Sequence, residues 1–185
     1  MPKVLVPLAP GFEEIEALAI VDILRRAEIE VVIAGLLPGP VSGAHNISVV
    51  PDTMLGSVNT DSFDMIVLPG GQPGTDNLNA DPRVHALLKE FAAKNKLIGA
   101  ICAAPIVLAA AGMLNGKKVA CYPTYIDRLN GGIYEDNPVV SDGTIITCQG
   151  VGTAIVFGLA LVALLTNQTN SDRVSRSMLV SNIRG

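Results

Sequence analysis

Short apolar runs that alternate with amphipathic segments constrain the fold of this chain more than any other feature. The runs Val4–Leu8 and Met65–Leu68 are apolar throughout and are followed by proline and glycine, as is typical of strands buried on both faces. Between them, apolar residues recur at helical spacing, as from Glu13 to Ala27. Strands that alternate with helices predict an α/β protein with a mostly parallel central sheet and helices on both faces.

The predicted elements follow one another along the whole chain. We expect strands over residues 30–35, 97–101 and 118–122, a short edge strand within 47–51, and a β-hairpin over 139–147 that turns at Asp142-Gly143. We expect helices over 83–94, 106–111 and 153–166, a loop or short hairpin over 36–46, and helical spacing in the tail 171–185. No repeat or linker divides the chain, so we predict one domain over residues 1–185.

Composition and charge exclude several classes of protein. The net charge is −4 and no basic run is present, so nucleic acid is not an expected partner. The longest apolar run, Ala154 to Leu165, is too short for a bilayer, which needs about 20 residues, and no signal peptide is expected before the first strand. Three widely spaced cysteines and two histidines match no disulfide framework or zinc motif, so we expect no metal and a cytoplasmic setting. No phosphate-binding glycine motif occurs, so no nucleotide cofactor is implied.

The segment from Leu97 to Pro105 is the strongest candidate for a functional site. Its pattern predicts a buried strand, a sharp turn at Cys102 and a helix just beyond. A side chain at such a turn lies over the first turn of the helix, where unpaired N–H groups carry partial positive charge. We therefore expect a lowered pKa and a reactive thiol at Cys102, as at the nucleophile turn of hydrolases. The alternative is a small apolar residue buried at the turn.

Periodicity separates two glutamates of the first predicted helix. Glu16 lies on the apolar stripe that continues through Ile20 and Ile23. A carboxyl on that stripe is partly desolvated, so we expect its pKa to be raised and the group to act as a proton donor, unless it reaches water at the edge of the stripe. Glu14 falls on the face of Asp22, and we expect it to be solvated.

A glycine pair follows the strand Met65–Leu68. Gly70 and Gly71 allow backbone N–H groups to approach an anion or oxyanion closely, although a plain tight turn has the same sequence. Binding sites in open parallel sheets lie beyond the carboxyl ends of the strands. Because Gly71 and Cys102 lie at such ends and Glu16 follows the first strand, we expect the three to converge.

The other candidate residues have less specific surroundings. Cys121 and Cys148 lie in predicted strands and are interpreted as small buried hydrophobic residues. His45 precedes the predicted edge strand and is interpreted as a loop or interface residue rather than a catalytic one.

The chain resembles the DJ-one/ThiJ/PfpI superfamily over nearly its whole length. The resemblance rests on the segments Gly11–Glu16, Val21–Ala27, Val67–Gly71, Ala100–Pro105 and Gly150–Thr153. It implies a flavodoxin-like sandwich that needs no cofactor and is usually a homodimer. A low charged content of 16% also favours a surface partly covered by a second subunit.

The resemblance also implies roles for single residues. Cys102 matches the nucleophile and oxidation-sensitive residue, and Glu16 matches the carboxyl that hydrogen-bonds it and shuttles protons. The N–H groups of Gly71 and Ala103 match the pair that stabilises an oxyanion. The resemblance places Gly70 and Tyr122 in the pocket. It places Glu13, Arg26 and His45 on the dimer side.

Three positions depart from the family pattern. Tyr122 stands where many members have a histidine near the cysteine, so a Cys–His pair and a peptidase activity are not expected. His45 stands where relatives often have an interface arginine, and Val151 replaces a proline in the wall of the pocket.

The activities implied by the resemblance all depend on the cysteine. Members convert methylglyoxal to lactate without glutathione, remove early glycation adducts, or act as redox-regulated chaperones. We therefore expect a Cys102-dependent glyoxalase or deglycase that acts on small aldehydes or on glycated protein or nucleotide adducts. The alternative is a redox-sensing stress protein or chaperone in which Cys102 is oxidised to the sulfinate and turnover is low.

Overall fold

A seven-stranded, mostly parallel sheet forms the centre of the molecule, as the computed structural model shows for residues 1–180. Its strand order is β10-β11-β7-β6-β1-β2-β5. The strands are β1 Lys3–Leu8, β2 Glu30–Gly35, β5 Thr53–Met54, β6 Met65–Leu68, β7 Leu97–Ile101, β10 Val139–Asp142 and β11 Ile145–Cys148. Strands β10 and β11 pair antiparallel, and the other neighbours pair parallel. This confirms the predicted sheet with one hairpin.

Two small sheets and a set of helices complete the described part of the chain. Strand β3 Val41–Ser42 pairs with β4 Ser48–Val49, and β8 Lys118–Val119 pairs with β9 Ile133–Tyr134. The α-helices are α1 Glu14–Arg26, α2 Gly74–Ala80, α3 Pro82–Ala93, α4 Pro105–Ala110, α5 Ala154–Leu165 and α6 Gln168–Ser177. Short 3₁₀ helices span Leu55–Ser57, Thr60–Ser62, Pro123–Arg128 and Val151–Thr153.

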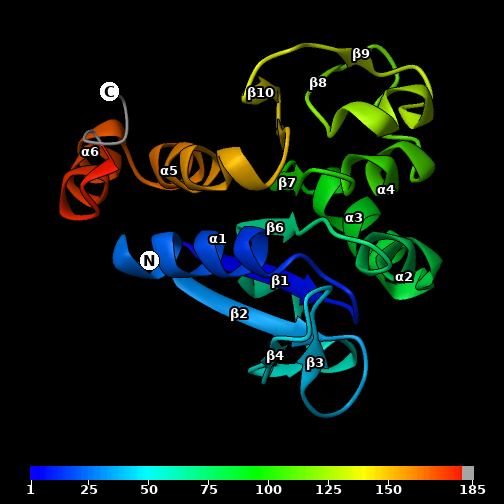
Figure 1. Cartoon of the computed structure of the whole chain (residues 1–185), viewed down its shortest axis with the longest axis horizontal. Coiled ribbons are helices and arrows are strands. Elements are labelled where there is room, and N and C mark those ends of the chain that lie inside the picture. Colours follow the sequence, from blue (N-terminus) through cyan, green and yellow to red (C-terminus); the bar gives the residue numbers. More distant parts are fainter. Residues whose placement is uncertain (181–185) are drawn as a thin grey trace.

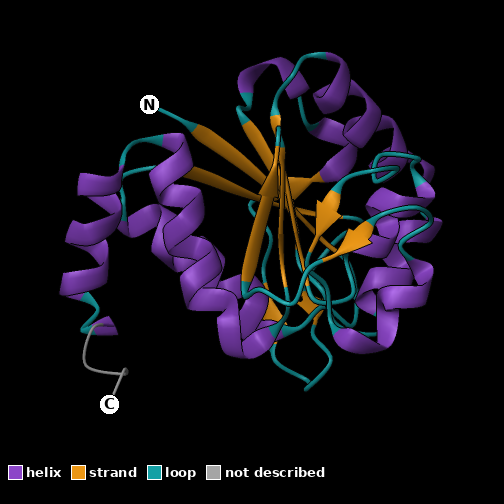
Figure 2. Cartoon of the chain, turned by 90° about the horizontal axis from the view of Figure 1, so that it is seen from above, coloured by secondary structure: helices purple, strands orange, loops and turns teal. Residues whose placement is uncertain are grey.

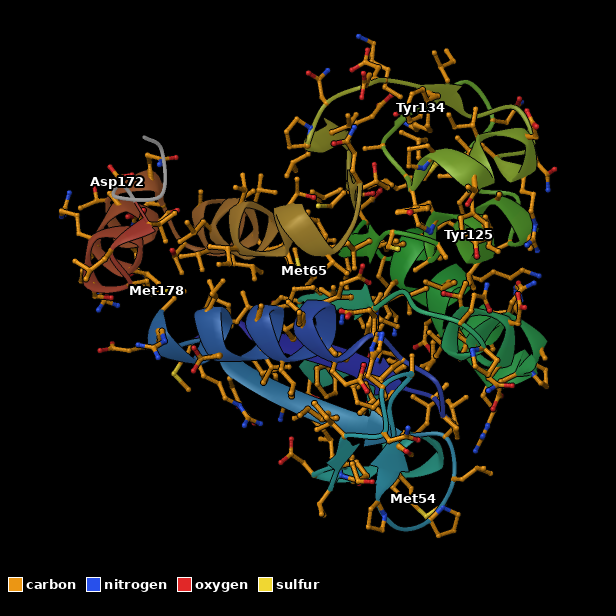
Figure 3. The ribbon with its side chains drawn as sticks, viewed as in Figure 1. Met54, Met65, Tyr125, Tyr134, Asp172 and Met178 are labelled. Carbon is orange, nitrogen blue, oxygen red and sulfur yellow. The ribbon has the colours of Figure 1, made fainter. Side chains whose placement is uncertain are left out.

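The helices lie on both faces of the sheet, which Figure 2 shows as a twisted fan between two helical layers. Helices α1 and α5 pack side by side on one face, and α3 and α4 lie on the other (Figure 1). Alternate residues of β1 supply the two cores, since Val4 and Val6 face α1 while Leu5 faces the opposite layer. Met65 of β6, labelled in Figure 3, is fully buried in the α1–α5 core.

Local sequence explains where the main helices begin. The Glu13 side chain caps α1 by accepting the N–H of Glu16 at 2.7 Å. Asp81 caps α3 by accepting the N–H of Arg83, and Pro82 occupies the first helical position. Helix α5 is apolar on all sides and approaches α1 closely, since a Cβ on Gly158 would lie 2.8 Å from Ile23 Cδ1.

Several predicted elements differ from the structure. The edge strand of the main sheet is β5, because the segment 47–51 turns back at Asn46 and pairs with β3 instead. The strand predicted over 118–122 is only β8 and lies outside the main sheet. Helix α2 was not predicted, because its glycine, threonine and asparagines have low helix propensity and burial of Leu78 stabilises it.

The last described helix follows closely after α5. Helix α6 begins at Gln168, before the predicted tail helix, and residues 181–185 of that prediction lie outside the described residues. Among residues 1–180, no helix combines the length and apolarity needed to cross a membrane.

Candidate active site

Cys102 forms a sharp turn between β7 and α4, as predicted. Its φ of 64° lies in the left-handed region, which is strained for a residue with a side chain. Hydrogen bonds on both sides hold this conformation, because Cys102 donates its N–H to the carbonyl of Cys148 at 2.9 Å and accepts the N–H of Tyr122 at 2.8 Å. The thiol is half-buried and lies against the α1–α5 core.

Glu16 brings a fully buried carboxyl from the first turn of α1 to this thiol. Its exposed fraction is 0%, and Oε2 accepts the N–H of Gly70 at 2.9 Å. Oε1 is buried and makes no hydrogen bond with the described residues, while the Cys102 thiol lies close enough to act on the pKa of the carboxyl. The acid expected on the apolar stripe therefore faces the sulfur.

The glycine pair after β6 fits closely between these two side chains. A Cβ on Gly70 would lie 2.7 Å from both Cys102 Cβ and Glu16 Oε2, so only glycine fits there. Gly71 has a φ of 88°, and its N–H and that of Ala103 lie near the Cys102 sulfur, where they favour its charged form. Glu16, the glycine pair and Cys102 therefore meet at the carboxyl ends of the strands, while the role of the two N–H groups stays a prediction.

The pKa of Glu16 is raised to about 7, as expected. Burial is the main cause, and the charge of Glu13 adds to it, while the hydrogen bonds to Cys102 and from Gly70 act in the opposite direction. A group whose pKa lies near the working pH both donates and accepts protons readily. A pKa of about 7 therefore suits Glu16 to general acid–base catalysis in neutral solution.

The expected lowering of the Cys102 pKa is wrong. Burial and the neighbouring Glu16 carboxyl raise the pKa of the thiol, and the N–H groups of Ala103 and Gly71 only partly offset them. Two adjacent negative charges in a buried site are unfavourable, so Glu16 and Cys102 titrate as a pair that keeps one proton near neutral pH. A thiolate forms in this pair when the carboxyl holds that proton.

A small pocket opens on the far side of Gly150 from Cys102, and neither Cys102 nor Glu16 is among its lining residues. It encloses about 290 Å³ and is lined by Tyr122, Pro123 and residues 149–153. Gly150 forms the wall nearest to Cys102, because a Cβ placed there would lie 3.8 Å from Sγ and 3.4 Å from the ring of Tyr122. Tyr122 therefore lies in the pocket wall, and Tyr125, labelled in Figure 3, packs edge-on against it at a centroid distance of 6.5 Å. The volume suits a small molecule.

Glu14 is buried, contrary to the expectation that it is solvated. Only 3% of the residue is exposed, and its carboxylate accepts the N–H of His45 at 2.6 Å and contacts His45 Nδ1 at 2.8 Å. The N–H of Ile47 approaches the same oxygen at 3.4 Å. The reason is the loop between β3 and β4, which folds over the first turn of α1, a contact that helical periodicity alone does not reveal.

The dimer-side candidates are separated by the length of α1. Glu13 lies beside His45, with 4.0 Å between Oε1 and Nδ1, whereas Arg26 pairs with Asp22 about 20 Å away along the helix. Within residues 1–180, Glu13, Glu14 and His45 are the one group whose metal-ligating atoms lie within 4.8 Å of one another. The hydrogen bonds between Glu14 and His45 account for this arrangement without an ion.

Sequence reasoning missed two residues next to the thiol. Cys148 was interpreted only as a hydrophobic residue, although its sulfur lies 3.0 Å from Thr153 Oγ1. Gly150 entered only through the family resemblance, although it forms the wall of the pocket. The available signal was a Gly-x-Gly segment at the carboxyl end of β11, which is the edge where binding sites of parallel sheets collect.

Comparisons with known proteins agree with this arrangement. Residues 2–164 match the DJ-1/PfpI family. The Drosophila melanogaster protein dj-1beta is 41% identical over 180 residues, 96% of each chain, and the Caenorhabditis elegans glutathione-independent glyoxalase DJR-1.2 is 41% identical over 164 residues, 86% of this chain and 87% of that one. The solved structure of oxidized Toxoplasma gondii DJ-1 has a TM-score of 0.93 at 36% identity and covers 97% of this chain and 98% of its own. The matches span every segment that builds the site.

Proposed function

The chain belongs to the DJ-1/PfpI family, and on this premise we propose that it converts small dicarbonyls such as methylglyoxal to hydroxy acids without glutathione or another cofactor. The observation that carries the proposal is the buried Glu16 carboxyl paired with the Cys102 thiol, with the N–H groups of Gly71 and Ala103 directed at the sulfur. The name of the nematode relative, a glutathione-independent glyoxalase, supports the same class of reaction.

The first step is attack by sulfur. With the shared proton on Glu16, the Cys102 thiolate adds to the aldehyde carbon of methylglyoxal and forms a hemithioacetal. Negative charge moves from sulfur to the aldehyde oxygen, next to the N–H groups of Gly71 and Ala103. Each such donor is worth about 3 kcal/mol of transition-state stabilisation. Glu16 then gives its proton to that oxygen.

The second step moves a proton between carbons. The Glu16 carboxylate removes the proton from the former aldehyde carbon, which gives an enediolate. The hydroxyl proton moves from the former aldehyde oxygen to the former ketone oxygen, and Glu16 returns its proton to the neighbouring carbon. The product is a lactate thioester on Cys102, and water hydrolyses it to lactate and the free thiol. A carboxyl with a pKa of about 7 both gives and accepts protons near neutral pH, a contribution of about 10²–10⁴-fold.

The pocket sets the class of substrate. Its volume of about 290 Å³ and its lining of Tyr122, Val151 and glycines suit a small uncharged aldehyde. Removal of early glycation adducts from proteins or nucleotides uses the same attack on an exposed carbonyl carbon and belongs to the same proposal. We place this activity in the cytoplasm.

We propose that the chain acts as a homodimer through the outer face of α1 and the loop beside β4. Ile15 and Val50, with 57% and 73% exposed, lie on this surface, and Leu18 and Ile47 extend it. Glu13 and His45 lie next to it, where the loop crosses the first turn of α1. Light scattering on the purified chain tests this, with Ile15→Asp expected to give a monomer.

The activity assay follows lactate formation from methylglyoxal in the absence of glutathione. We expect turnover by the full chain and its loss in Cys102→Ser. Cys121→Ser is the matched control, because Cys121 is a buried cysteine whose side chain packs in the opposite core. A Cys102→Ser variant that retains full turnover would contradict the mechanism.

A redox-sensing stress protein or chaperone is the second candidate function, and one observation favours it. The two N–H groups that would stabilise an oxyanion also suit a sulfinate on Cys102, which is half-buried and therefore open to oxidants. Mass spectrometry after mild peroxide treatment, compared with the lactate assay, separates the two functions. Oxidation of Cys102 in a chain that makes no lactate favours the sensor.

A further inference from the structure

A second thiol, that of Cys148, lies beside Cys102 on the same side of the sheet. Cys148 is the last residue of β11 and pairs in register with Ile101, and both side chains enter the α1–α5 core. Its carbonyl accepts the Cys102 N–H at 2.9 Å, so the two backbones are adjacent. Disulfides join residues whose Cα atoms are about 4.4–6.8 Å apart, a separation typical of neighbouring strand residues.

Gly150 connects the surroundings of the two thiols. A Cβ placed on it would lie 3.8 Å from Cys102 Sγ, while its N–H donates to Thr153 Oγ1, the atom that lies 3.0 Å from the Cys148 sulfur. Because Gly150 has no side chain, the space next to the Cys102 sulfur stays open on that side. The charge of Glu16 acts on both thiols, which places them around the same carboxyl.

The surroundings of Cys148 differ from those of the third cysteine. Thr153 Oγ1 lies 3.0 Å from its sulfur, and this contact opposes the effect of burial, which raises the pKa of the Cys148 thiol. Cys121 has burial alone, which raises its pKa to about 11, and it faces the opposite core. Donors on a buried sulfur stabilise the developing thiolate that disulfide chemistry requires.

We propose that Cys148 is a resolving thiol that converts oxidised Cys102 into an intramolecular disulfide. A hydroperoxide transfers one oxygen to the Cys102 thiol, which becomes a sulfenic acid while the peroxide is reduced to an alcohol or water. The sulfur of Cys148 then attacks the sulfenic sulfur, an S–S bond forms, the S–O bond breaks, and the hydroxyl leaves with the Cys148 proton as water. The disulfide protects Cys102 from further oxidation and is reversed by a thiol reductant.

Peptide mapping tests this directly on the full chain. Trypsin separates the three cysteines onto peptides 97–117, 119–128 and 129–173. After reduction, a substoichiometric dose of hydrogen peroxide, alkylation and digestion, we expect peptides 97–117 and 129–173 to be linked, with the loss of two hydrogen atoms. Dithiothreitol should release both. These readouts need no turnover, so they hold or fail independently of the proposed activity.

Two serine variants sharpen the outcome. In Cys148→Ser, Cys102 should gain two oxygen atoms at a peroxide dose that leaves the unmodified chain as the disulfide. Cys121→Ser, a matched change in a buried cysteine, should keep the link. The proposal is overturned if the unmodified chain accumulates sulfinate on peptide 97–117 while Cys148 is alkylated, or if Cys148→Ser forms sulfinate no faster than the unmodified chain.

Discussion

Glu14 and Glu16 lie two residues apart on the first turn of α1, and both are buried, yet their pKa values shift in opposite directions. Burial acts to raise the pKa of Glu14, but the ring and N–H of His45 outweigh it, and the pKa is lowered. Burial raises the pKa of Glu16 to about 7, because a thiol and one N–H are weaker partners than a histidine ring and two amides. The partners of Glu14 outweigh its desolvation and those of Glu16 do not, so Glu14 is a fixed charge while Glu16 exchanges protons.

The two surroundings also differ in origin. The partner of Glu14 is a surface loop between β3 and β4, and His45 is 70% exposed on its side-chain surface. The partners of Glu16 are the ends of β6 and β7, in the centre of the sheet. A surface loop therefore holds the charged carboxylate, and the central sheet holds the proton donor, where precise acid–base chemistry favours a well-packed support.

Neutralising the two carboxyls separately should give the largest difference. We expect Glu16→Gln to lower kcat/KM for methylglyoxal by about 10²–10⁴-fold, since it removes the proton carrier. Glu14→Gln should change it far less, because Glu14 does not contact Cys102. Lactate formation by the two purified variants measures this, and equal losses would show that Glu14 belongs to the catalytic machinery.

The pH dependence of stability should differ in sign between the two positions. The folded-state pKa of Glu16, about 7, lies above its ordinary 4.5, so the stabilisation present below pH 4.5 is lost as the pH rises towards 7, by about 3 kcal/mol. Glu16→Gln should remove this decline in the free energy of unfolding. Glu14 acts in reverse, since its lowered pKa gives stability above pH 4.5 that is lost on acidification. Urea unfolding between pH 2 and 8 tests both signs, since the Glu14 contribution is lost only below pH 4.5.

Gly70 lies against the Glu16 carboxyl and Gly43 lies against the Glu14 carboxyl, so alanine at each position makes a matched pair of substitutions. A Cβ on Gly70 meets Cys102 and Glu16 at 2.7 Å, whereas a Cβ on Gly43 clashes with the Glu14 carboxyl alone. We expect Gly70→Ala to cost about 1–3 kcal/mol of stability and to reduce turnover. Gly43→Ala should cost less, because the loop and one side chain can move, and should keep turnover. Thermal unfolding and the lactate assay together distinguish the two, and a turnover loss in Gly43→Ala alone would contradict this division.

The smallest expected effect concerns His45. Its hydrogen bond and ion pair with Glu14 raise its pKa, so the stability it provides is present below pH 6.5 and is lost as the pH rises through the folded-state pKa. Because the side chain is exposed, the effect should be small and should weaken with salt. NMR titration of the ring should show the His45 pKa falling towards 6.5 in Glu14→Gln. An unchanged titration would mean that the pair does not persist in solution.

Local sequence was sufficient for the elements that position the thiol. Strands 30–35 and 65–68 have the predicted bounds, and the turn at Cys102 follows from an apolar run broken before a proline. The raised pKa of Glu16 was also predictable, because a carboxyl on the inner stripe of a helix is desolvated wherever that helix packs.

Non-local contacts account for what the sequence did not reveal. Glu14 is buried by a loop that comes some 30 residues later in the chain, so its own helix gave the wrong environment. The Cys102 pKa is raised by the Glu16 carboxyl, which comes from a helix distant in the sequence. Helix α4, which follows the turn, has only 6 residues, so its dipole lowers the pKa of the thiol too little to offset this effect. Cys148 required the register of β11 against β7, which no short motif specifies.

The hydrogen bond from Cys102 to the carbonyl of Cys148 has a consequence for biosynthesis. The strand that accepts it, β11, emerges from the ribosome long after β7, and it completes the wall of the pocket through Gly150. Such sequence-distant pairings form late and slowly during folding. A nascent or truncated chain thus cannot display the assembled thiol site, and its chemical reactivity reports that the polypeptide has been synthesised through β11 and has closed its sheet.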